Sequence, residues 1–144
     1  MHARLNGLES PWAQHLERSY FPAPVLLARR PVADELWFLD NGARQLVLDE
    51  HCNTAVTRWT LRERGFSLAG ADASELVEAV PLEALRSEAR QLLEEYANGA
   101  PEPTAGTMSR WKQPYLVLMC CRILHTLEAA TVESKHALDL GCHR

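Results

Sequence analysis

The clearest periodicity in the chain is an apolar stripe between residues 82 and 96. Apolar residues recur there at steps of three and four positions, and charged residues occupy the opposite side at the same spacing. This period predicts an amphipathic helix with one buried and one solvated face. The apolar side consists of Leu82, Leu85, Ala89, Leu92 and Tyr96, and the charged side of Glu83, Arg86, Arg90 and Glu94.

A longer helix is predicted from about Ser109 to Ala129. Pro114 fits in its first turn, where a missing backbone N–H breaks no intrahelical hydrogen bond. Ser134 is a residue type favoured at a helix N-cap, so a further helix is expected to open at Ser134–Lys135. The apolar positions of the long helix are Tyr115, Leu116, Met119, Ile123 and Leu127.

Two shorter helices are predicted in the middle of the chain. From about residue 51, Ala55, Trp59 and Arg62 share one helical face, and Gly65 is a typical helix end. A short helix is expected at 73–77, before Pro81.

The N-terminal part has a β-like pattern instead. Residues 15–27 alternate loosely around Pro22 and Pro24, which is typical of an edge strand or a strand end. Residues 35–39 and 44–48 are strand candidates on either side of Asp40–Asn41–Gly42, a strong turn signal. We therefore expect a β-hairpin here.

These elements predict the α+β fold class with mostly helical content. We expect an N-terminal β-hairpin or small sheet, within residues 1–50, packed on a bundle of about four helices, within residues 51–144.

Composition narrows the setting of this fold. The chain has 144 residues, 47% of them hydrophobic, and a formal net charge of −4, which argues against a nucleic-acid partner. The adjacent Cys120 and Cys121 do not suit a disulfide on a helix, so reduced thiols are expected. The sequence shows neither a membrane-spanning apolar run nor a signal-peptide pattern, and we expect a cytoplasmic location without membrane contact.

Arg122 and Lys135 are the first candidate site. An arginine on a mostly apolar helix needs a partner, and a lysine in the first turn of a helix opposes the helix dipole unless an anion is present. An anion, such as a phosphate, held between the two helices satisfies both. The alternative is that Arg122 pairs with a carboxylate such as Glu128 and that Lys135 is a surface lysine.

Several segments resemble the aminoglycoside adenylyltransferases of the streptomycin/spectinomycin type. These segments are LERSYFPAP, RWTLRERGFSLAGADASELVEAVPLEALR and RILHTLEAATVESK, and the resemblance runs over roughly residues 8 to 138. The resemblance implies that residues 1–50 correspond to part of a nucleotidyltransferase core. It also implies that Arg122 and Lys135 contact the ATP phosphates and that Glu17 is the general base toward the drug hydroxyl. ATP and magnesium are implied for the full family enzyme.

The sequence departs from that family where the metal would bind. It contains neither a Gly-Ser dipeptide nor an Asp-x-Asp triplet, which supply the magnesium site of adenylyl transfer. The loop at 98–113 has Glu102 as its only acid, so drug specificity does not carry over. We expect a nucleotidyltransferase-like part that binds an aminoglycoside or a nucleotide, has no metal or cofactor of its own and is inactive alone.

Two other functions stay open. One is a stand-alone binding module for a small molecule or anion, and the other is a non-catalytic protein that forms a homodimer through unpaired strands. A zinc site is disfavoured: Cys121 and His125 share a helix face, but His51, Cys52, Cys142 and His143 match no zinc spacing.

Overall fold

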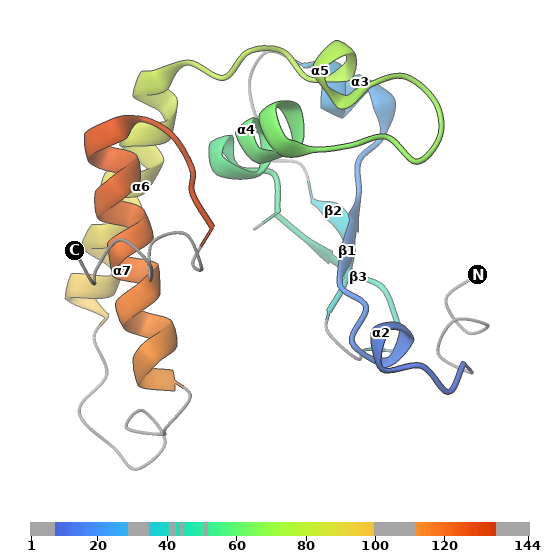
Figure 1. Ribbon diagram of the computed structural model, residues 1–144, viewed down its shortest axis with the longest axis horizontal. Coiled ribbons are helices and arrows are strands. Elements are labelled where there is room, and N and C mark those ends of the chain that lie inside the picture. Colours follow the sequence, from blue (N-terminus) through green and yellow to red (C-terminus); the bar gives the residue numbers. More distant parts are fainter. Residues whose placement is uncertain are drawn as a thin grey trace. The chain divides into compact units, whose positions relative to one another are not determined.

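The computed structural model describes residues 8–28, 35–40, 43, 45–50, 52–99 and 112–134. The chain divides into two compact units, Met1–Ala79 and Val80–Arg144. The elements of the first unit are α2 (Pro11–Gln14), β1 (Arg18–Tyr20), α3 (Ala23–Leu27), β2 (Leu36–Leu39), β3 (Val47–Asp49), α4 (Ala55–Arg64) and α5 (Ala73–Leu76); those of the second are α6 (Leu82–Asn98) and α7 (Lys112–Ala129). Figure 1 shows this order along the chain.

The first unit contains a three-stranded antiparallel sheet with the order β1-β2-β3. Strands β2 and β3 form the predicted hairpin, with Trp37 opposite Leu48, although β3 begins at Val47 rather than near residue 44. The side chains of Leu36 and Phe38 lie on one face of β2 and are buried, so that face contributes to the core of this unit.

The segment before the hairpin corrects one expectation. Only Arg18–Tyr20 is a strand, whereas Ala23–Leu27 is helical and not part of a β-like stretch. Pro22 is the N-cap of α3 and Pro24 lies in its first turn, positions where a fixed φ and a missing N–H favour a helix start. The two prolines therefore begin a helix and do not end a strand.

Helix α4 ends where the sequence predicts, at Gly65, but it begins at Ala55 rather than near residue 51. Thr54 is its N-cap and accepts a hydrogen bond from the Thr57 N–H at 3.1 Å. The helix ends before Gly65, whose N–H donates to the Leu61 carbonyl. A Cβ at position 65 would lie 2.2 Å from that carbonyl oxygen, which explains the glycine. The predicted short helix is also present, as α5.

Helices α6 and α7 lie side by side in the second unit (Figure 1). Their contact buries Leu85 and Ala89 of α6, and α7 contributes buried Met119 and Ile123. The long helix begins at Lys112, three residues after the predicted start, with Pro114 in its first turn. It ends at Ala129, and the next residue, Ala130, is buried and has a left-handed φ of 52°.

The α+β class with mostly helical content is confirmed. The division between the units falls after Ala79, so α4 and α5 belong with the sheet, and the expected boundary at residues 50 and 51 lies inside the first unit. The predicted group of helices is thus divided, with the α6–α7 pair in the second unit. None of the described helices is both long enough and apolar enough to cross a membrane.

Candidate functional site

Arg122 lies in the middle of α7, on the part of the helix that faces α6. Its side chain is half-buried, and its backbone carbonyl accepts a hydrogen bond from the Thr126 hydroxyl at 2.9 Å. Among the residues that the structure describes, no carboxylate pairs with the guanidinium, and Glu128 is exposed. The carboxylate alternative for Arg122 is therefore not what the described residues show.

The surroundings of Arg122 include a tyrosine with a perturbed pKa. Burial raises the pKa of Tyr96 on α6 above its ordinary value, and Tyr115 and Cys120 on α7 raise it further, while the positive charge of Arg122 lowers it. These residues come from the facing helices of the second unit. A guanidinium, a phenol and a thiol are thus close enough to interact electrostatically.

Lys135, the predicted partner of Arg122, lies outside the described residues. Ser134 is exposed and is the last described residue before it. The convergence of Arg122 and Lys135 on one anion therefore stays a prediction.

Glu17 is exposed and directly precedes β1, one residue short of the strand on which the resemblance implies it. It belongs to the first unit, whereas Arg122 belongs to the second. The general-base role of Glu17 therefore stays a prediction.

Three arginines that sequence reasoning gave no such role hold helix ends together. Arg58, Arg62 and Arg86 each donate to backbone carbonyls at or just after the C-terminal turn of another helix. Such carbonyls have no intrahelical partner, so a guanidinium satisfies them and gains acceptors for its own N–H groups. We call these residues the capping arginines.

Arg58 is the most buried of the capping arginines, with 4% of its surface exposed. Its Nη1 donates to the carbonyls of Leu26 and Ala28 at 3.0 and 3.1 Å, and Nη2 donates to the Val25 carbonyl at 2.5 Å. Its Nε donates to Asn53 Oδ1 at 3.0 Å. Burial lowers the pKa of Arg58, and the group is stabilised by neutral oxygen acceptors at the end of α3.

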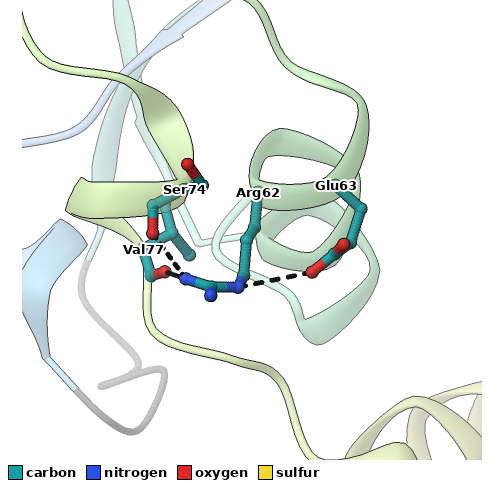
Figure 2. A network of polar contacts seen from close by, with 4 residues as sticks. All are labelled: Arg62, Glu63, Ser74 and Val77. Atoms are coloured by element: carbon teal, nitrogen blue, oxygen red, sulfur yellow. Dashed lines mark hydrogen bonds and ion pairs between the residues drawn. The ribbon is translucent and has the colours of Figure 1, made fainter.

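Arg62, one turn further along α4, does the same for α5. Figure 2 shows its Nη1 donating to the carbonyls of Ser74, at 2.6 Å, and Val77. Its Nε lies 3.3 Å from a carboxylate oxygen of Glu63. Because Arg58 and Arg62 point from one helix to α3 and α5, these contacts join the helices of the first unit.

Arg86 plays the corresponding part in the second unit. Its Nε donates to the Leu127 carbonyl near the end of α7 at 3.2 Å, and its Nη1 donates to Glu83 at 2.9 Å. A cation at a helix C-terminus is also favoured by the helix dipole. The sequence placed Arg86 on a solvated face; its half-buried side chain instead links α6 to α7.

The described residues contain no group of three or more His, Cys, Asp and Glu side chains that could hold a metal ion. His125, one of the weighed zinc ligands, has its Nε2 3.2 Å from the Thr131 hydroxyl. The positions of His51, Cys142 and His143 lie outside the described residues. The described His, Cys, Asp and Glu side chains therefore give no support to a zinc site.

Comparison with known proteins finds no matching family model, no matching curated protein and no matching solved structure. The site must therefore be interpreted from its own residues and from the resemblance in the sequence.

Proposed function

We propose that the chain is the substrate-binding or nucleotide-binding part of an aminoglycoside-nucleotidyltransferase-like protein, without a catalytic metal site of its own. The observation that carries this proposal is the half-buried side chain of Arg122, whose guanidinium has no carboxylate partner within the described part of the chain. An anion is a strong hydrogen-bond partner for such a guanidinium. Phosphate oxygens match its planar fork.

Two features of the same unit support a phosphate rather than an apolar ligand. The Tyr96 phenol lies close enough to Arg122 to interact with it electrostatically, and a neutral phenol can donate a hydrogen bond to an anion. Lys135 follows Arg122 in the sequence by 13 residues (135 − 122) and supplies a second positive charge. On this proposal the chain alone transfers no adenylyl group, because one exposed carboxylate, Glu17, cannot replace a metal that neutralises phosphate charge.

A thermal melt with ATP or pyrophosphate tests the proposal. Ligands that bind only the folded chain stabilise it by mass action, so millimolar ATP should raise the melting temperature of the native chain. Arg122→Ala should remove most of that increase. Arg90→Ala is the matched control, since Arg90 is an exposed arginine on α6 and its loss should leave the ATP effect intact. Equal melting temperatures with and without ATP in the native chain would overturn the proposal.

One observation favours the homodimer as a second candidate function. Within the described part of the sheet, β1 and β3 each pair with one strand only, so each presents an outer edge. Unpaired strand edges recruit another chain through backbone hydrogen bonds. Such a dimer is compatible with anion binding in the second unit.

A further inference from the structure

One face of the sheet carries exposed apolar side chains. Tyr20 on β1 lies opposite Trp37 on β2, and Trp37 lies opposite Leu48 on β3, so the three residues form a row across the sheet. Trp37 is 50% exposed and Leu48 is 47% exposed. We call this row the aromatic row. Exposed tryptophan and leucine side by side are typical of a binding surface.

Arg18 lies on the same face, two residues before Tyr20 on β1. Its guanidinium carbon is 5.6 Å from the centre of the Tyr20 ring, which places the cation over that ring. Its strand partner, Leu39, is buried. The cation–π attraction holds the guanidinium beside the aromatic row but provides no acceptor for its N–H groups.

Two nitrogens of Arg18, Nε and Nη2, are buried and have no hydrogen-bond partner among the residues that the structure describes. Buried donors without acceptors are rare, because each loses its hydration and gains nothing in return. The capping arginines show the contrast, since Arg58 satisfies the corresponding atoms with Asn53 and Val25. Arg18 therefore lacks the acceptors that Arg58 has at the same two nitrogens.

The two unsatisfied nitrogens define the geometry that a matching acceptor group must have. Nε–H and Nη2–H lie on one edge of the planar guanidinium and point in parallel, so together they match the two oxygens of a carboxylate. No carboxylate of the described residues occupies that edge. A bidentate pair formed there would be strong, because water is excluded from both donors.

We propose that this face binds a small organic carboxylate with an apolar or aromatic body. The carboxylate pairs with the Nε and Nη2 edge of Arg18, and the body packs on the exposed Trp37 and Leu48. Both nitrogens are shielded from solvent in the free chain, so the proposed binding requires the atoms that cover them to move aside. This site lies in the first unit and is independent of the phosphate site proposed at Arg122.

Calorimetric titration of the full chain with phenylacetate tests this inference. Phenylacetate carries both required parts, whereas phenylacetamide lacks the charge and acetate lacks the body. We expect saturable binding of phenylacetate and affinities at least about tenfold weaker for the other two. The indole N–H resonance of Trp37, assigned by its loss in Trp37→Phe, should shift with phenylacetate.

Two variants separate the contributions of charge and shape. Arg18→Lys keeps the charge but lacks two parallel donors, and it should weaken phenylacetate binding about tenfold. Arg122→Ala should leave phenylacetate binding unchanged, which separates this site from the nucleotide site. If Arg18→Lys does not fold, the comparison of the three probes on the native chain decides. Equal affinity for phenylacetamide, no saturation at millimolar phenylacetate, or unchanged binding in a folded Arg18→Lys variant would each overturn the inference.

Discussion

Arginine has different roles in this chain depending on what its donors meet. Arg58 donates to three backbone carbonyls and an amide oxygen, so each nitrogen of its buried guanidinium makes at least one hydrogen bond. Arg122 meets no acceptor for its guanidinium among the described residues, and Arg18 leaves one edge unsatisfied. The first pattern is structural, whereas for the other two we propose an anion as the missing partner.

Arg58→Met should therefore destabilise the first unit strongly. The substitution keeps much of the side-chain volume but leaves Asn53 and the carbonyls at the end of α3 without their donor. We expect a loss of about 3 kcal/mol in the free energy of unfolding, measured with urea. Arg90→Met, at an exposed position, should change it by less than about 0.5 kcal/mol. Equal stability of the two variants would contradict a structural role for Arg58.

Tyr96 provides a test of the position of Arg122. Burial, with Tyr115 and Cys120, raises the pKa of Tyr96 above 10.0, and Arg122 lowers it. The folded chain holds the phenol proton more tightly than the unfolded chain, whose Tyr96 pKa is 10.0. The stability that this protonated phenol contributes is therefore fully present below pH 10.0 and is lost as the pH rises through the folded pKa. Arg122→Ala should raise the Tyr96 pKa further, measured by tyrosinate absorbance with Tyr96→Phe for assignment. An unchanged Tyr96 pKa in Arg122→Ala would show that the two side chains are not neighbours.

At the scale of elements, local sequence signals located most helices but not their partners. Gly65 marks the end of α4, and the apolar stripe marks α6, because helix stops and periodicity are local properties. Helix α3 was missed because Pro22 and Pro24 suit both a strand end and a helix start. The contacts of Arg58 and Arg62 with α3 and α5 join distant segments, which no local pattern reveals.

The N-cap of α4 gives a prediction at this scale. Thr54→Ala removes the acceptor of the Thr57 N–H and should destabilise the first unit by about 1 kcal/mol, whereas Thr54→Ser should retain most of the stability. Thermal or urea unfolding of the two variants measures the difference. If alanine and serine at position 54 were equivalent, the hydroxyl would contribute nothing to the start of α4.

For the whole molecule, composition and pattern predicted the α+β class, but not the division after Ala79. The capping arginines act within these units, since Arg58 and Arg62 join α4 to α3 and α5, and Arg86 joins α6 to α7. The candidate site was only partly predictable. The sequence identified Arg122 as an arginine that needs a partner. It revealed neither the nearby Tyr96 nor the unsatisfied nitrogens of Arg18, because both depend on contacts between residues of different helices and strands.

The outer edges of the sheet predict self-association. Light scattering across a concentration series should show a mass above the 16.2 kDa of one chain. Val47→Lys places a charge on β3, an edge strand, and should shift the chain toward the monomer. Val117→Lys, at an exposed valine on α7, is the control and should not. A mass of 16.2 kDa at every concentration would exclude this association.

Calorimetric titration of ATP into the native chain, Arg122→Ala and Lys135→Ala tests the proposed phosphate site most directly. If both side chains hold the same phosphates, the native chain should bind ATP saturably and each variant should weaken binding about tenfold, with Arg90→Ala unchanged. Pyrophosphate should compete with ATP, since the phosphates provide the contact. No saturable heat with the native chain, or native affinity in Arg122→Ala, would contradict the account.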